Sequence, residues 1–421
     1  MRGRGRGLAP PLVALAAAVA LAACASRVAP PSGVGEGPFG PGADERTLRA
    51  AAGREAAALE ARLPVVDDAR LAAYLAGLAE RLGAGAAGGP EIRVVVVRDP
   101  TLNAFALPGG RLFVHTGLLS AVQNEAQLAA ILGREIAHVA GRHALAAARA
   151  ARSTPALAVV ASLARTISGT TAAARESAGA PVLGPTANVV LGLRLPLATL
   201  AAVDGYGADR EQAADAGALE RLVRAGYDPA EAPRAFRALR AEASERGAVE
   251  TFLLGRPAAL DARIRALEPL LAGGHAAAAG KGAVDSPEFA AVVRPVVRDN
   301  AAEEVRFGRF ALARRQLDRV LAATPDDPVA HLHYGELYRL QAQRPAQAAE
   351  ASALAARAAE RYERAAALDP AYAAPHRQLG FLHYQRGDVP RARAAFARYL
   401  QLAPEAPDAP RVREYLAELT R

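Results

Sequence analysis

The chain has 421 residues, of which 52% are hydrophobic, and its formal net charge at neutral pH is +8. This length is enough for two domains with hydrophobic cores. The arginines are scattered among acidic residues along helical segments and form no compact basic patch with interleaved aromatics, which argues against a nucleic-acid partner. Cys24 is the single cysteine, which excludes an intramolecular disulfide.

The N-terminal segment has the pattern of a targeting sequence. Three arginines precede an apolar stretch over residues 8–23, which is shorter than the roughly 20 residues that a membrane span requires. The stretch ends in Leu-Ala-Ala before Cys24, as in a bacterial lipoprotein box. We therefore predict a lipoprotein signal peptide over residues 1–23, lipidation of Cys24 and a flexible tether over residues 24–45. The alternative is an ordinary signal peptide with a chance cysteine.

The cellular location follows from the same segment. Ala25 follows the cysteine, and no aspartate retention signal stands there. We therefore expect an outer-membrane lipoprotein that faces the periplasm.

Residues 46–116 predict helices followed by a small sheet. Helical periodicity over residues 46–84 is broken near Pro64. Residues 92–98 (IRVVVVR) form a β-branched run that predicts a buried strand. Residues 111–116 (RLFVHT) predict a second strand after a Pro-Gly-Gly turn.

A long helix is expected over residues 124–152. Asn124 suits its N-cap, with Gln127 as the capping-box partner, and a Ser-Thr-Pro sequence stops it. The apolar stretches within residues 156–203 predict core helices, and contact with lipid is the alternative. Helical patterns return over residues 208–271.

The C-terminal part of the chain contains a repeat. Residues 272–285 predict a low-complexity linker, and residues 286–421 predict an all-α tetratricopeptide solenoid with a concave, protein-binding face. Tyr334-Gly335 opens a longer copy of the repeat. The alternative is a generic helical bundle. The positions that fit the 34-residue pattern are Leu379, Gly380, Ala392, Phe396 and Pro404.

Residues 134–138 read Arg-Glu-Ile-Ala-His, which is a zinc-binding HExxH helix with its first histidine replaced. Positions four apart project from the same face of a helix, so two histidines there can hold one zinc while the intervening glutamate activates a water molecule. Arg134 has no lone pair for a metal and stays protonated. The pattern therefore predicts Glu135 as the general base and His138 as a zinc ligand, with one ligand missing.

Together with residues 103–110 (NAFALPGG) and 225–229 (AGYDP), residues 210–215 (REQAAD) resemble the HtpX/BepA type of membrane-associated zinc metalloproteases, metallopeptidase family 48. The resemblance implies a gluzincin-like metalloprotease domain over residues 46–271, an α+β fold that is mostly helical, with zinc as its cofactor. It also implies Glu211 as a zinc ligand and Asp215 as the acid that supports the site.

The resemblance further implies a substrate-binding edge strand around Arg111, Phe113 and His115. Arg256 stands where relatives carry a histidine near the metal. Among the remaining histidines, His115 is the only expected stand-in for the missing ligand. His143 should point elsewhere, because five residues turn a helix by about 140° from His138.

Three functions remain open. The first is a zinc metalloendopeptidase that degrades outer-membrane proteins or assists their assembly. The second is a pseudopeptidase that acts as a chaperone-like adaptor through its groove and repeats, and the third is a purely structural repeat lipoprotein. The expected partners are unfolded or misassembled envelope proteins, a protein bound by the repeats, and the membrane through Cys24, but no nucleic acid.

The two arginines also suggest a chemical hypothesis. We expect Arg134 and Arg256 to pair with Glu135, Glu211 and Asp215 in place of zinc. We therefore expect little or no hydrolysis, because damage to a metal's ligand shell causes large losses of metal affinity and activity.

Overall fold

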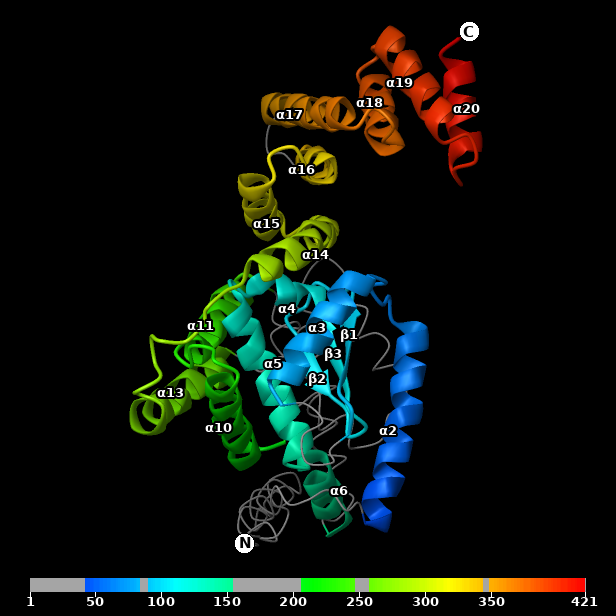
Figure 1. Cartoon of the computed structure of the whole chain (residues 1–421). Helices are drawn as coiled ribbons and strands as arrows, with labels where there is room; N and C mark the ends of the chain where they lie inside the picture. Colours follow the sequence, from blue (N-terminus) through cyan, green and yellow to red (C-terminus); the bar gives the residue numbers. More distant parts are fainter. Residues whose placement is uncertain (1–41, 84–89, 154–205, 247–256, 344–347, 421) are drawn as a thin grey trace, which may run out of the picture.

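A computed structural model describes residues 42–83, 90–153, 206–246, 257–343 and 348–420 (Figure 1). Cys24 and the rest of the predicted signal peptide, the tether up to residue 41, the apolar stretches within residues 156–203 and Arg256 lie outside these described residues. The described chain forms an α+β region followed by a row of helices that extends away from it.

The structure is mostly helical and contains a small sheet, as predicted. In the α+β region the elements are α2 (Ala43–Arg62), α3 (Ala69–Arg81), β1 (Arg93–Val97), β2 (Ala104–Ala106), β3 (Arg111–His115), α4 (Thr116–Ala121), α5 (Glu125–Ala140), α6 (His143–Ser153), α10 (Ala208–Arg224), α11 (Glu231–Ser244) and α13 (Pro257–Gly274). The repeat region contains α14 (Pro287–Arg306), α15 (Phe310–Ala323), α16 (Pro328–Gln341), α17 (Ala348–Leu368), α18 (Ala373–Gln385), α19 (Val389–Leu402) and α20 (Ala409–Glu418).

The sheet has the strand order β1-β3-β2, so β3 is its central strand. β1 pairs with β3 in parallel and β2 pairs with β3 antiparallel, with Phe105 opposite Phe113. The prediction that Arg111, Phe113 and His115 form an edge strand was therefore wrong. The edge is β2, a strand of three residues, which is too short for its alternation to be recognised in the sequence.

Alternating side chains of the sheet pack on helices at both faces. On one face Val95, Val97, Phe105 and Phe113 form a core with apolar residues of α2. On the other face Val96, Ala106, Leu112 and Val114 join a larger core with α3 and α5. Because successive side chains of a strand point to opposite faces, both faces of the sheet are buried. β2 lies beside α5 (Figure 1).

The predicted helix over residues 124–152 is two helices. Its N-cap was predicted correctly, because Asn124 accepts a hydrogen bond from the backbone N–H of Gln127, 2.9 Å away. α5 then ends at Ala140, and Arg142 takes a left-handed backbone conformation with φ of 51°. α6 begins at His143 in a new direction, so angles calculated along α5 do not apply to it.

The repeat region confirms the tetratricopeptide prediction. Its helices form successive antiparallel pairs, and a glycine in one helix faces a ring from the next (Figure 1). A Cβ atom added to Gly380 would lie 2.4 Å from the ring of Phe396, and one added to Gly335 would lie 2.4 Å from the ring of Tyr362. The small residues are therefore required by the packing of the large ones.

The first repeat helices also pack on the α+β region. Thr116 on α4 donates a hydrogen bond of 2.8 Å to Asn300 on α14. The guanidinium of Arg319 on α15 donates to the backbone oxygen of Ser120, 2.7 Å away. One hydrophobic core therefore continues from α3 and α5 into the repeats. None of the helices within the described ranges combines the length and the apolar character needed to cross a membrane.

Candidate functional site

The candidate site lies where α5 crosses α10. A Cβ atom on Gly217 of α10 would lie 2.9 Å from Cβ of Ala137, and Gly133 of α5 lies close to the backbone of Ala218. These glycines allow the two helices to approach closely. The crossing places residues 134–138 of α5 against the first turns of α10, which carry Glu211 and Asp215.

The guanidinium of Arg134 lies among three carboxylates. Its Nη1 binds Glu135, its Nη2 binds Glu211, and its Nε lies 3.2 Å from Oδ1 of Asp215. These side chains are largely buried, since Arg134 is 12% exposed and Asp215 is 2% exposed. The contacts with Glu135 and Glu211 are charge-assisted hydrogen bonds, which are the strong kind, whereas the contact with Asp215 is an ion pair without a hydrogen bond.

A second arginine joins the group from α13. Nη2 of Arg263 binds Oε2 of Glu211, the same oxygen that Arg134 contacts. Arg263 also lies over the ring of Phe236, 5.7 Å from its centroid. The sequence predicts this role for Arg256, which lies outside the described residues. Arg263 was missed, although Arg263-Ile264 belongs to the motif that Arg256 opens.

Burial raises the pKa of these carboxyl groups, and the two arginines lower it. Burial raises the pKa of Glu135 to about 7, although Arg134 opposes the shift. Burial likewise raises the pKa of Asp215. For Glu211 burial is outweighed by Arg134 and Arg263, which hold its pKa below the usual range. Glu211 is therefore the firmly ionised centre of the group.

His138 faces Glu211 without contacting it. Its Nε2 lies 3.8 Å from Oε1 of Glu211, and the backbone N–H of Tyr206 donates to that oxygen from 2.9 Å. Burial and the neighbouring Arg134 lower the pKa of His138, so the imidazole is neutral. Tyr206, whose ring centroid lies 4.8 Å from that of His138, was not predicted, because no motif in the sequence covers the residues just before α10.

His143 contacts His138, contrary to the prediction. Their Nδ1 atoms lie 2.8 Å apart, with the rings at 79°. The prediction failed because the chain turns at Gly141 and Arg142, which brings the first residue of α6 back over the end of α5. The hydrogen bond between the two rings fixes the orientation of His138.

Glu135 also faces the backbone of β2. The backbone N–H of Ala106 lowers the pKa of its carboxylate, against the larger effect of burial. In the β2 segment, the backbone groups of residues 103, 105 and 107 point toward β3. The N–H of His115 donates to the backbone oxygen of Asn103, and the N–H of Leu107 donates to that of Arg111. Ala104 and Ala106 therefore direct their backbone groups away from β3, toward α5.

His115 is not a stand-in for the missing ligand. It is fully buried, and its Nδ1 lies 2.7 Å from the hydroxyl of Thr101. That hydroxyl donates to Asp99, so its oxygen accepts from the Nδ1–H of a neutral His115. The other two predicted substrate contacts are structural as well: Arg111 binds Glu60 of α2 at 3.1 Å, and Phe113 stacks on Phe105.

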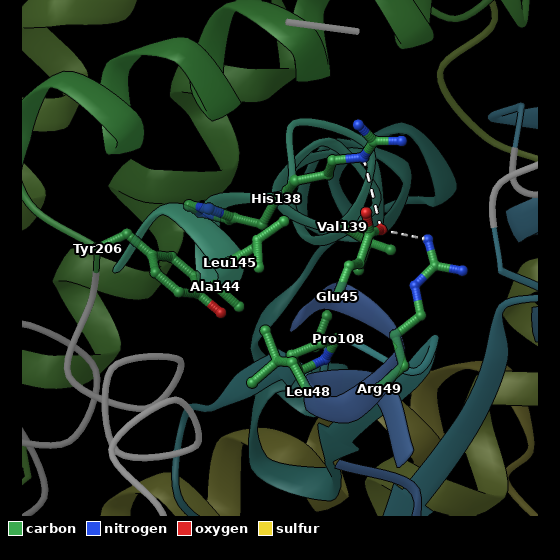
Figure 2. A pocket seen from close by; sticks show the side chains of 11 residues that line it. Glu45, Leu48, Arg49, Pro108, His138, Val139, Ala144, Leu145 and Tyr206 are labelled. Atoms are coloured by element: carbon green, nitrogen blue, oxygen red, sulfur yellow. Dashed lines mark hydrogen bonds and ion pairs between the residues drawn. The ribbon is translucent and has the colours of Figure 1, made fainter. Parts of the chain in front are cut away.

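A small pocket lies beside the site. Figure 2 shows His138 and Tyr206 on one side of it and Glu45 and Arg49 on the other. Glu45 also pairs with Arg142 at the turn after α5, at 3.5 Å, which ties α2 to the end of α5. The cavity volume of about 20 Å³ suits about one water molecule.

The residues present do not fit a zinc ion as they stand. Zinc needs electron-pair donors around a central point, and here the guanidinium of Arg134 fills the space between Glu135, Glu211 and Asp215. Within the described ranges, no three histidine, cysteine or acidic side chains are grouped so that they could share a metal.

Comparison with known proteins finds a family profile that matches the region containing this site. Residues 66–271 match the profile of Peptidase family M48, and residues 346–417 match a tetratricopeptide repeat profile. A Vibrio cholerae relative named as a putative beta-barrel assembly-enhancing protease is 30% identical over 175 residues, which cover 41% of this chain and 34% of the relative.

Two further relatives support the match. The beta-barrel assembly-enhancing protease of Escherichia coli is 28% identical over 187 residues, which cover 42% of this chain and 34% of that protein. The mitochondrial metalloendopeptidase OMA1 of Schizosaccharomyces pombe is 54% identical over 48 residues, which cover 11% of this chain and 14% of that protein. The chain thus spans about a third of the length of the assembly-enhancing proteases that it matches.

Proposed function

We propose that this protein acts in the assembly and quality control of envelope proteins, as a protein that binds unfolded clients without cleaving them. The proposal starts from the match of residues 66–271 to the profile of Peptidase family M48. The assignment to envelope proteins is supported by the names of two relatives, which are beta-barrel assembly-enhancing proteases. We infer the lack of cleavage from the position of Arg134 among Glu135, Glu211 and Asp215.

The contacts of Glu135 support this proposal. A general base must reach a water molecule with a free carboxylate oxygen. The carboxylate of Glu135 instead binds Arg134, and the backbone N–H of Ala106 lies on its β2 side. Arg134 is part of the chain and stays protonated, so it cannot diffuse away as a bound ion can. It therefore always competes with water for the carboxylate of Glu135.

Client binding is supported by two features of the fold. β2 is an edge strand, and edge strands bind extended peptides through backbone hydrogen bonds. Ala104 is the β2 residue whose backbone groups would pair with a client, because the N–H of Ala106 is directed at Glu135. The tetratricopeptide helices α16–α20 add a second protein-binding surface, and two linked weak sites bind more tightly than either site alone.

The proposed location follows from the N-terminal sequence. Cleavage before Cys24 and lipidation of that residue would anchor the protein to the outer membrane, facing the periplasm where its clients pass. Labelling cells with a radioactive fatty acid tests this part by itself. The full chain should incorporate the label, and the Cys24→Ser variant should not.

A second candidate function is a zinc metalloendopeptidase. One observation favours it: Nε2 of His138 and Oε1 of Glu211 face each other at 3.8 Å, close to the separation that two ligands of one zinc would have. For this function the side chain of Arg134 would have to leave the three carboxylates, and some other group would have to supply the missing ligand.

Zinc content and cleavage of unfolded casein by the purified full-length chain separate the two functions. We expect zinc far below one per chain, retention of casein on the immobilised protein and no new casein fragments. The Arg134→His variant is the matched comparison, because it restores the HExxH sequence with one change. Stoichiometric zinc and cleavage by the unchanged protein would establish the endopeptidase, and failure to retain casein would refute client binding.

A further inference from the structure

We propose that Arg134 is a built-in substitute for the metal, so that the domain reaches its full stability without zinc, and that removing this guanidinium opens a site for a divalent cation. The proposal concerns what holds α5, α10 and α13 together. It shares with the proposed function the exclusion of zinc by Arg134, but it does not depend on client binding, which casein retention tests separately.

The three carboxylates that Arg134 contacts are largely buried. Glu135 and Asp215 are 5% and 2% exposed, and Glu211 is 14% exposed. Ionised carboxylates in such positions need a cation nearby, because the solvation they lose is expensive to replace. In relatives of the HExxH type a metal supplies that charge, and in this chain Arg134 is the residue in contact with all three groups.

The guanidinium of Arg134 matches the arrangement of its partners. The three nitrogens of Arg134 each face a different carboxylate: Nη1 faces Glu135, Nη2 faces Glu211 and Nε faces Asp215. The planar fork donates hydrogen bonds to two of these carboxylates and lies within ion-pair distance of the third, whereas a lysine ammonium is a single point at the end of a flexible stem. The arrangement therefore requires arginine rather than positive charge alone.

Arg263 contacts the group from its rim. It binds Oε2 of Glu211, so it neutralises one carboxylate from the rim of the group and leaves Oε1 facing His138. Arg263 alone cannot replace Arg134, because the structure shows its nearest contact with Glu211 and not with Asp215 or Glu135. Removing Arg134 would leave two of the three carboxylates without a contacting cation.

The latent cation site follows from the same geometry. Without the guanidinium, Nε2 of His138 and Oε1 of Glu211 remain in place, since His143 orients the first and Tyr206 binds the second. A histidine at position 134 would add a third donor from the same face of α5 as His138, one turn away. Nitrogen and oxygen donors in this number suit zinc.

Thermal unfolding of the full-length chain with EDTA or with added zinc tests the proposal. For the unchanged protein we expect the same Tm in both conditions. We expect Arg134→Met and Arg134→Lys to lower the Tm by about 10 °C, because each leaves buried carboxylates unpaired. Arg134→His should lose stability in EDTA, recover it in zinc and bind about one zinc per chain.

The matched control is Arg237→Met, which breaks an exposed pair with Glu268 and should leave the Tm nearly unchanged in both conditions. A Tm of the unchanged protein that falls in EDTA would overturn the proposal, as would an Arg134→Lys variant as stable as the parent. If Arg134→Met does not fold, zinc binding by Arg134→His still decides the second half: its absence, by calorimetry with zinc chloride alone, refutes the latent site.

Discussion

Two helix pairs in this molecule use glycine for opposite purposes. Where α5 crosses α10, Gly133 and Gly217 bring two backbones together and place charged side chains in contact. Where α18 packs on α19, Gly380 makes room for the ring of Phe396. The first contact is specified by ion pairs between distant parts of the chain, and the second by apolar packing between neighbouring helices.

The two contacts differ in how much stability a substitution removes. A buried ion pair that loses one partner leaves an uncompensated charge, whereas a repeat contact that changes shape costs only packing. The two regions should therefore respond differently to substitutions of similar size. Substitutions in each region can test this contrast, beginning with the largest expected effect.

The boundary between the regions should behave like the site and not like the repeats. Glu304 on α14 is fully buried and accepts hydrogen bonds from Arg246, at 2.8 Å, and from Arg309. We expect Glu304→Ala to lower the free energy of unfolding by about 3–5 kcal/mol, because both guanidiniums lose their buried partner. Chemical denaturation of the full chain measures this loss.

The neighbouring Glu303 provides the control for Glu304. It pairs with Arg306, which is 73% exposed, so Glu303→Ala should change stability by less than about 1 kcal/mol. Equal effects of the two alanine substitutions would mean that the boundary is not held by the buried charge.

The repeat contact should give an intermediate effect. Gly380→Ala places a methyl group against the ring of Phe396, and we expect a loss of about 1–3 kcal/mol from the forced repacking. Gly77→Ala in α3 is the matched control, since nothing lies within 4 Å of the added Cβ atom. That variant should be stabilised by up to about 1 kcal/mol through helix propensity. A Gly380→Ala variant that gains stability like the control would contradict the tight packing.

The contrast also explains which features the sequence could predict. The spacing of Gly380 and Phe396 belongs to one local repeat, so the pattern alone located the solenoid. The capping of α5 by Asn124 is local too, and its prediction was correct. The strand β2 was missed because its pairing with β3 depends on a turn at residues 107–110, and the strand has only three residues of its own.

The site was predictable in its residues but not in its geometry. Motifs identified the five residues that the structure brings together, which are Arg134, Glu135, His138, Glu211 and Asp215. The contact of His143 with His138 depends on the left-handed backbone of Arg142, a residue type that rarely adopts that conformation. No pattern of apolar and polar residues encodes such a turn. The contact of Arg263 with Glu211 likewise depends on how α13 packs.

A pH effect of smaller size should arise at His115. Burial lowers the pKa of this imidazole below its ordinary value of 6.5, and Asp99, 3.8 Å away, offsets the change only in part. The unfolded chain therefore takes up a proton more readily than the folded chain. The free energy of unfolding should be highest above pH 6.5 and should fall as the pH drops below that value, with a slope of up to about 1.4 kcal/mol for each pH unit.

Denaturation at a series of pH values tests this effect with His115→Asn, whose amide can still donate to Thr101. The variant should lose stability less steeply than the parent as the pH falls from about 6.5 to about 5. His275→Asn, in the segment after α13, should follow the parent. Parallel curves for the parent and His115→Asn would show that His115 does not contribute.

The smallest effect on stability is expected at an exposed ion pair between α11 and α13. Arg237 on α11 binds Glu268 on α13 at 2.7 Å, and both side chains are about half exposed. Arg263, also on α13, binds Glu211 in the buried site. Glu268→Ala should change the free energy of unfolding by no more than about 0.5 kcal/mol, because water solvates the arginine that is left. A loss as large as that expected for Glu304→Ala would mean that burial does not decide how much an ion pair contributes. The two regions would then differ only in how their side chains pack.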